Sequence, residues 1–283
     1  MASREMIRHH TQNVVTKKNE KLNMRLTILI LITLICSCKN NKMDNKENEL
    51  GVVPITTSSE VAKKHFEKAR FLVQNGINGN PIEQYKKAIE LDSKFVRMYN
   101  FISMYSQDDS IKRQNHQLAK KYKHLVSKEE QMLVDATEFR LNNPDNSDEA
   151  ILFELAELRP SDKYLHHSIC FLLFRKNPSL AIKAGKKSVE LDKDYGSGYN
   201  ILGYAYINNN QFDEANEAFD NFIRCEPENA NPYDSKADLM LKLGNYKEAL
   251  KLKQKAYELD KSFDWIPEEI VDIKAKIDSS TNN

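Results

Sequence analysis

Residues 199–227 read YNILGYAYINNNQFDEANEAFDNFIRCEP, and this stretch decides the fold. It holds two amphipathic segments separated by the polar run Asn208-Asn209-Asn210. Polar runs of this kind mark the place where one helix ends and the next begins. A second stretch of the same design covers residues 233–260 and breaks at Gly244-Asn245. Each stretch therefore predicts two helices joined by a short turn.

The same unit recurs along most of the chain. Each unit ends in a marker such as Glu-Leu-Asp or Cys-Glu-Pro, and its apolar residue falls at Leu91, Leu125, Leu158, Leu191, Cys225 and Leu259. The steps between these residues are 34, 33, 33, 34 and 34. The residues 22 positions before the markers are Ala69, Ser103, Ala136, Ile169, Gly203 and Ala237. Five of these six are small, which is what a close approach between the two helices of a unit requires.

The period and the residues identify a resemblance to the tetratricopeptide repeat. Its motif W-x2-L-G-x2-Y is matched by Tyr199, Leu202, Gly203 and Tyr206, with Tyr in place of Trp. The later Ala, Phe and Pro of that repeat appear as Ala215, Phe219 and Pro227. The resemblance covers residues 60–260; it is strongest in the last two units and rests mainly on spacing over residues 94–158.

The resemblance implies an all-α fold, a right-handed α-solenoid of about six helix pairs. One further amphipathic segment, residues 265–277, predicts a C-terminal capping helix within the terminal region 261–283. Local signals support the helix boundaries. Ser127-Lys128-Glu129-Glu130 predicts a capping box, and Pro81 and Pro178 suit the first position of a helix.

The N-terminal region predicts an export signal. Residues 26–38 read LTILILITLICSC, an uncharged run that follows several Lys and Arg residues. A membrane-spanning helix needs about 20 residues, whereas the apolar part of a signal peptide needs roughly 7–15, and this run has the shorter length. The ending Ile35-Cys36-Ser37-Cys38 resembles the lipobox of bacterial lipoproteins, which implies lipidation of Cys38. A short apolar anchor is the alternative. We therefore expect a signal peptide over 1–37, with Met24 as a candidate for the actual start, and a lipidated, flexible tether over 38–59.

Charge and motifs argue against several classes of function. The 42 basic and 41 acidic side chains nearly balance, so nucleic acid is not an expected partner. No nucleophile elbow, phosphate loop or dinucleotide fingerprint occurs in the sequence. His166 and His167 are adjacent and would point about 100° apart on a helix, so they cannot share a metal ion. We expect no enzymatic activity, no cofactor and no metal. Cys170 and Cys225 are expected to be buried thiols, although a disulfide between them stays open.

The first helices of such an array line a concave groove. Two positions of each unit, one helical turn apart, should face it: Phe66, Asn100, Leu133, His166, Asn200 and Asp234 at the first, and Arg70, Met104, Thr137, Cys170, Tyr204 and Asp238 at the second. The Lys and Asn clamp with which some tetratricopeptide proteins hold a peptide carboxylate is not reproduced at the His166, Asn200 and Asp234 units. We take His166, Asn200, Tyr204, Asp234 and Asp238 as candidate binding residues. The two aspartates would favour a basic or hydroxyl-rich ligand; a solvated face without a ligand is the alternative.

Together these features predict an adaptor lipoprotein of the bacterial cell envelope. A lipid anchor would hold it to a membrane, the outer membrane being the expected one, and the groove would bind a protein or peptide partner. The alternative is a lipoprotein that captures a glycan or nutrient, since some outer-membrane nutrient-binding lipoproteins carry similar repeats. Those proteins present aromatic platforms, whereas Trp265 is the only Trp in this sequence. A hydrolase is disfavoured because no catalytic set emerges.

Overall fold

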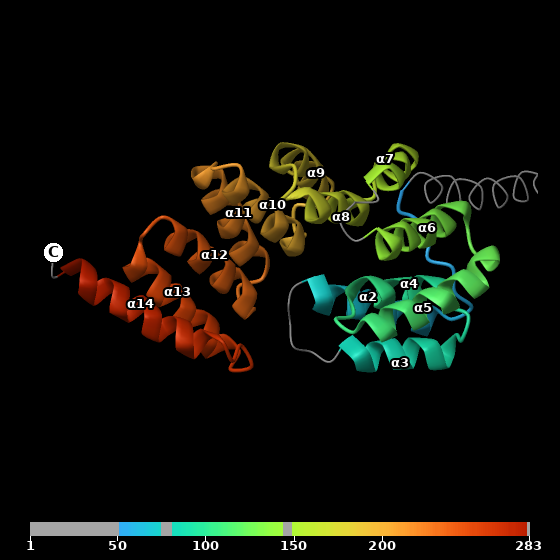
Figure 1. Cartoon of the computed structure of the whole chain (residues 1–283), viewed down its shortest axis with the longest axis horizontal. Coiled ribbons are helices and arrows are strands. Elements are labelled where there is room, and N and C mark those ends of the chain that lie inside the picture. Colours follow the sequence, from blue (N-terminus) through green and yellow to red (C-terminus); the bar gives the residue numbers. More distant parts are fainter. Residues whose placement is uncertain (1–50, 75–80, 144–148, 282–283) are drawn as a thin grey trace, which may run out of the picture. The chain divides into compact units, whose positions relative to one another are not determined.

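The computed structural model describes residues 51–74, 81–143 and 149–281. The expected signal peptide, Cys38 and the first part of the expected tether lie outside these residues. Within them the chain folds into thirteen α-helices and the short 3-10 turn η1 (Lys123–Leu125), and it forms no strand (Figure 1).

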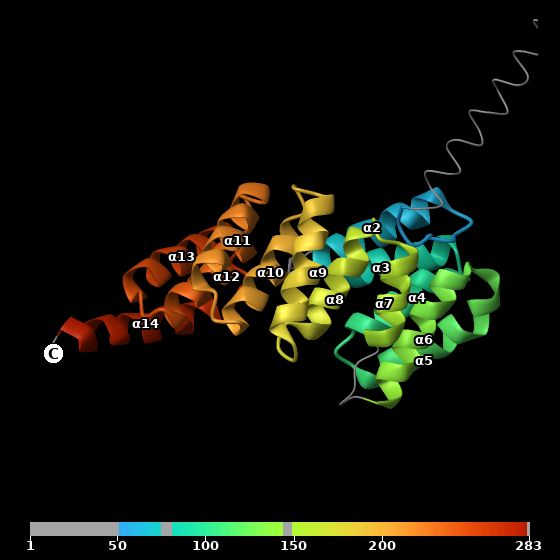
Figure 2. The same cartoon turned by 90° about the horizontal axis from the view of Figure 1, so that it is seen from above.

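Six helix pairs follow one another along the chain, as the marker spacing predicts. The first helices of the pairs are α2 (Glu60–Gln74), α4 (Val96–Tyr105), α6 (Lys128–Asn142), α8 (Lys163–Leu173), α10 (Gly196–Asn208) and α12 (Ala230–Lys242). The second helices are α3 (Pro81–Leu91), α5 (Asp109–Tyr122), α7 (Glu149–Leu158), α9 (Pro178–Leu191), α11 (Phe212–Cys225) and α13 (Tyr246–Leu259). The two helices of each pair pack against each other (Figure 2). The predicted all-α fold of six helix pairs and one further helix is confirmed.

The predicted helix boundaries have the expected local chemistry. The Ser127 side chain accepts a hydrogen bond from the backbone N–H of Glu130, and the Glu130 carboxylate accepts one from the N–H of Ser127, which completes a capping box. Pro81 and Pro178 are the first residues of α3 and α9. At two of the predicted breaks the backbone enters the left-handed region, with φ of 57° at Asn210 and 73° at Gly244.

The small residues of the repeat lie where the helices of a pair meet. All six residues at this position of the units are buried, and Ala69 and Ala237 are fully enclosed. At Gly203 the approach is close: a Cβ atom added there would lie 2.6 Å from the ring of Phe219 in α11. Only a residue without a side chain allows this contact, so the sequence pattern and the packing have the same cause.

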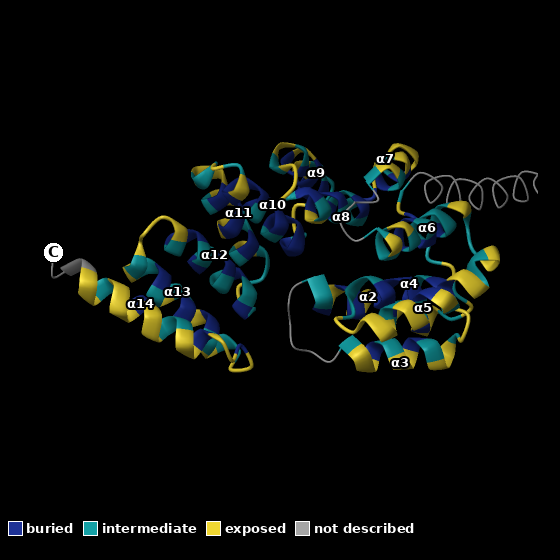
Figure 3. Ribbon diagram, viewed as in Figure 1, coloured by how far each residue is buried: buried dark blue, intermediate teal, exposed yellow. Residues whose placement is uncertain are grey.

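Burial follows the pairing of the helices. Buried residues collect where helices face one another, and exposed residues cover the outer faces (Figure 3). The last helix, α14 (Ile266–Thr281), packs on α13 through Ile266 and Ile273 and exposes much of its remaining surface. No helix in the described part of the chain is both long and apolar enough to cross a bilayer.

Residues 52–59 differ from the sequence expectation. They belong to the range expected to be a flexible tether, yet the structure places them as an ordered, non-helical segment on the repeats, and Val53 is only 2% exposed. The N–H of Val53 donates to the carboxylate of Asp162, far along the chain. Because such partners come from distant units, no local pattern in the sequence marks this segment as packed.

Candidate functional site

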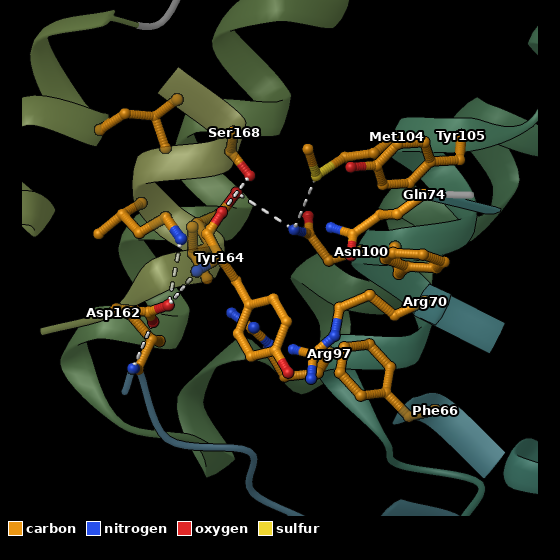
Figure 4. Close-up of a pocket in the computed structure, with 15 residues that line it drawn as sticks. Phe66, Arg70, Gln74, Arg97, Asn100, Met104, Tyr105, Asp162, Tyr164 and Ser168 are labelled. Atoms are coloured by element: carbon orange, nitrogen blue, oxygen red, sulfur yellow. Dashed lines mark hydrogen bonds between the residues drawn. The ribbon is translucent and has the colours of Figure 1, made fainter. Parts of the chain in front are cut away.

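A cavity of about 70 Å³ lies among the first helices of the first four units (Figure 4). We call it the arginine pocket. Its polar lining includes Arg70, Gln74, Arg97, Asn100, Asp162 and Tyr164. Apolar side chains complete its walls, among them Phe66 of α2, Leu133 of α6 and Val53 of the N-terminal segment. The pocket is thus built from parts of the chain that are far apart in the sequence.

Two guanidinium groups dominate the pocket. Arg70 is 8% exposed, and its guanidinium carbon lies 3.4 Å from the ring centroid of Tyr164 and 5.4 Å from that of Phe66. Arg97 approaches the same cluster, with its guanidinium carbon 5.7 Å from the centroid of the Phe66 ring. Burial lowers the pKa of Arg97, although Glu130 and Asp162 act in the opposite direction. An arginine nevertheless stays charged in a protein, so both groups carry a full positive charge.

The nearby carboxylates are already engaged by other donors. Asp162 accepts backbone N–H bonds from Val53, Tyr164 and Leu165 at 2.7, 2.9 and 3.1 Å. Glu130 accepts the N–H and the hydroxyl of Thr56. Within the described residues neither Arg70 nor Arg97 forms an ion pair with a carboxylate, so a buried cation and a half-buried one share a pocket without a direct counter-charge.

A polar side chain beside the arginines has a hydrogen-bond acceptor that is not used. Asn100 is 4% exposed, and its side-chain oxygen has no hydrogen-bond partner among the described residues. Its amide nitrogen donates to the carbonyl oxygen of Leu133 at 3.4 Å. A buried polar atom without a partner costs free energy, and a ligand that donates a hydrogen bond would remove that cost. The arrangement therefore suits an acidic group with a neighbouring N–H or O–H.

The repeat spacing located part of this pocket and missed part of it. Phe66, Arg70, Asn100, Met104 and Leu133 all stand at the positions that the spacing assigns to the groove, and all line the pocket.

Arg97 and Tyr164 also line the pocket but stand at neither of these positions. Arg97 precedes the groove residue Asn100 by about one helical turn, so a search extended by one turn along each first helix would have found it. No periodic signal in the sequence marks Tyr164.

Two of the candidate residues lie away from the arginine pocket. His166 lines a separate cavity of about 430 Å³ together with Phe153 and Lys183, and its Nε2 lies 2.9 Å from the carbonyl oxygen of Pro160. Asn200 is half-buried, and its side-chain oxygen has no hydrogen-bond partner in the described chain. The structure does not bring either residue together with the two arginines.

The other three candidates meet in one cluster, but around a lysine. Lys253 of α13 has a side chain only 1% exposed, and its Nζ lies 2.7 Å from Asp234, 3.0 Å from Asp238 and 2.6 Å from Glu269 of α14. The hydroxyl of Tyr204 donates to Asp238 at 2.8 Å. Burial disfavours the charged lysine, but the carboxylates of Asp238 and Asp234 outweigh it and raise the pKa of Lys253.

This cluster corrects the interpretation of Asp234 and Asp238 as a binding site. The sequence expectation treats Asp234 and Asp238 as an open attraction for a basic ligand, whereas the structure places the ammonium of Lys253 between them. Lys253 belongs to a second helix, and its direction toward α12 depends on how the helices pack. The cluster ties α12, α13 and α14 together.

The thiols and possible metal ligands add no further site. Cys170 and Cys225 are both free; Cys170 is buried and Cys225 half-buried. Burial raises the pKa of Cys170 to about 12, so this thiol stays protonated. Among the described residues, no group of three or more His, Cys, Asp or Glu side chains is arranged to hold a metal ion.

Helix pairs that repeat with the steady step of the markers, with a small residue at the point of closest approach, define an array of tetratricopeptide-type repeats. No family model matches the chain. Over 121 residues, 40% of the chain, the sequence is 32% identical to the human mitochondrial import receptor subunit TOM70. The chain spans only 20% of the length of that protein.

Several solved structures are also similar to the chain. A structure of MamA is 19% identical, with coverage of 71% of this chain and 93% of that chain and a TM-score of 0.40. YrrB, described as a TPR protein with an unusual peptide-binding site, is 16% identical, with coverage of 74% and 91% and a TM-score of 0.40. At these values the likeness carries no argument, and the repeat class rests on the geometry of the chain itself.

Proposed function

We propose that the chain is a protein-interaction scaffold whose arginine pocket holds an acidic group of a partner. One observation carries this proposal: Arg70 and Arg97 line one pocket with no carboxylate paired to either among the described residues. Arginine forms strong, charge-assisted hydrogen bonds to carboxylates, and exclusion of water strengthens them. An aromatic wall of Phe66 and Tyr164 would also contact the apolar part of the bound group.

The partner we infer is a protein segment, and we assign no reaction to the pocket. The groove positions that line it come from successive first helices, so a segment lying in the groove would meet one unit after another. Lipidation of Cys38 and attachment to a membrane of the cell envelope, the outer membrane being the expected one, complete this proposal. An anchored scaffold with a carboxylate-binding groove would hold an envelope protein near the membrane.

The test compares acidic peptides with their neutral counterparts. The full-length protein is applied to a peptide array in which each Asp or Glu peptide has an Asn or Gln twin and each free C-terminus has an amidated twin. We expect the acidic members to bind, and we expect the Arg70→Gln, Arg97→Gln double variant to lose at least tenfold in affinity.

Arg113→Gln is the matched control, because Arg113 lies exposed on α5 outside the pocket. It should bind as the native protein does, and circular dichroism should show equal helix content in all three proteins. If the acidic peptides bind the double variant as tightly as the native protein, the arginine pocket is not the site. A crosslinked pull-down from envelope membranes with the same three proteins then identifies the natural partner.

A further inference from the structure

The segment that precedes the first repeat crosses the starts of three other repeats. We call residues 52–58 the strap. It meets Asp162 just before α8, Glu130 in the first turn of α6, and Asp92 in the turn between α3 and α4. These three carboxylates lie where the second helix of one unit passes to the first helix of the next, and we call this surface the turn edge.

The strap is held mainly through its backbone and its hydroxyl groups. The N–H of Val53 donates to Asp162 at 2.7 Å, and the N–H of Thr56 donates to Glu130 at 3.0 Å. The hydroxyl of Thr57 and the N–H of Ser58 donate to Asp92 at 2.7 and 2.9 Å. Charge-assisted bonds of this kind are roughly twice as strong as neutral ones. The turn edge thus recognises the form of an extended chain more than its side chains.

The strap contacts carboxylates at the starts of successive units, in the reverse of their order along the chain: Val53 meets Asp162, Thr56 meets Glu130 and Thr57 meets Asp92. Val53 and Thr56 are three positions apart and engage carboxylates of adjacent units. One position of the strap requires an apolar side chain: that of Val53 is buried, whereas Val52 beside it is 46% exposed.

We propose that the turn edge is a docking surface for an extended segment with an apolar residue followed, three and four positions later, by hydroxyl residues, and that the strap is its intramolecular occupant. The strap is exchangeable, because hydrogen bonds and only two apolar side chains, those of Val53 and Ile55, hold it on the repeats. Val53 also lines the arginine pocket, so displacement of the strap widens the entrance to that pocket. This inference goes beyond the proposed function and stands without it.

The strap can be released by one charge. Val53→Asp in the full chain places a carboxylate in a buried position beside Asp162, so we expect it to detach the strap and leave the turn edge intact. Val52→Asp is the matched control, since its side chain already faces solvent. The probe is a fluorescent peptide with the sequence of residues 51–59, GVVPITTSS, and its binding is followed by anisotropy.

A tethered segment competes at an effective concentration in the millimolar range, so the free peptide should bind the native protein and Val52→Asp weakly. It should bind Val53→Asp at least tenfold more tightly, and a peptide carrying the same Val→Asp change should not bind. Hydrogen exchange should show slow amides at Val53, Thr56 and Ser58 in the native protein and fast ones in Val53→Asp. If Val53→Asp loses helix content, the Thr56→Val, Thr57→Val variant replaces it, because it removes donors without burying a charge.

Two results would overturn the proposal. One is exchange of the strap amides at the rate of an unprotected chain in the native protein. The other is equal affinity of the peptide for the native protein and for the variant with the released strap. The strap experiment does not depend on the Arg70 and Arg97 variants. If it fails, the proposed function is unaffected; if the peptide array fails, the proposal for the turn edge is unaffected.

Discussion

Gly203→Ala tests whether close helix approach governs this repeat. In an ordinary helix the change would stabilise the protein by about 1 kcal/mol, because alanine is the better helix former. Here the new methyl carbon would lie 2.6 and 2.7 Å from two ring carbons of Phe219, well inside the separation of about 3.5–4.0 Å that carbon atoms prefer. Phe219 is fully buried, so its ring has no free space to enter.

The two effects have opposite signs, and the clash should dominate. Overpacking of a well-packed core costs typically about 1–3 kcal/mol, and an overlap with a rigid ring on this scale falls at the upper end. After subtraction of the gain in helix propensity, the free energy of unfolding should fall by about 1–2 kcal/mol. The urea midpoint of the full chain, followed by circular dichroism, should therefore fall by about 0.5 M at an unchanged slope.

A double-mutant cycle separates the clash from every other effect of the methyl group. In a Phe219→Leu background the smaller side chain leaves room, so the cost of Gly203→Ala should vanish or become a gain. The coupling energy between the two sites should be at least about 1 kcal/mol. An equal cost of Gly203→Ala in both backgrounds, or stabilisation in the native background, would refute the packing argument.

Three further changes test other parts of the fold. Burial, with a smaller effect of Arg70, lowers the pKa of His167 to about 4 from 6.5. As the pH falls, His167 therefore binds a proton in the unfolded chain before it does so in the folded protein, so the free energy of unfolding should fall by about 2 kcal/mol between pH 7 and pH 5. The fall should be smaller in His167→Phe, and urea midpoints at each pH measure it. Lys253→Met leaves three carboxylates without their cation, and two of these carboxylates are about 40% exposed. The free energy of unfolding should therefore fall by about 2–3 kcal/mol. The control Lys251→Met, at an exposed lysine, should cost less than about 0.5 kcal/mol. Ser127→Ala removes the capping box of α6 and should cost about 1 kcal/mol, seen as a lower melting temperature; no change would mean that the cap contributes nothing.

Much of the architecture could be predicted because its causes are local and periodic. The markers from Leu91 to Leu259 give the number of units, and the polar breaks at Asn210 and Gly244 fix where helices end. Small residues such as Gly203 recur because each pair repeats one packing contact. A one-dimensional pattern is sufficient when the structure itself repeats along the chain.

The candidate site could be predicted only in part. Periodicity indicates which positions face the groove, and Arg70 and Asn100 of the arginine pocket were among them. It does not show which neighbour a long side chain meets, so the direction of Lys253 toward Asp234 and Asp238 was missed. It also gives no information on contacts that leave the repeat pattern, such as the contact of Val53 with Asp162.

The sequence by itself determined the class of fold, the number of helix pairs and the position of their turns, because helix periodicity, capping and close approach act over about one repeat. The tertiary structure decided that Arg70 and Arg97 share a pocket, that Lys253 forms ion pairs with both aspartates of the acidic pair, and that the strap lies on the turn edge. The physical reason is that burial and the pairing of charges depend on which units are brought together in space, and sequence separation does not encode that.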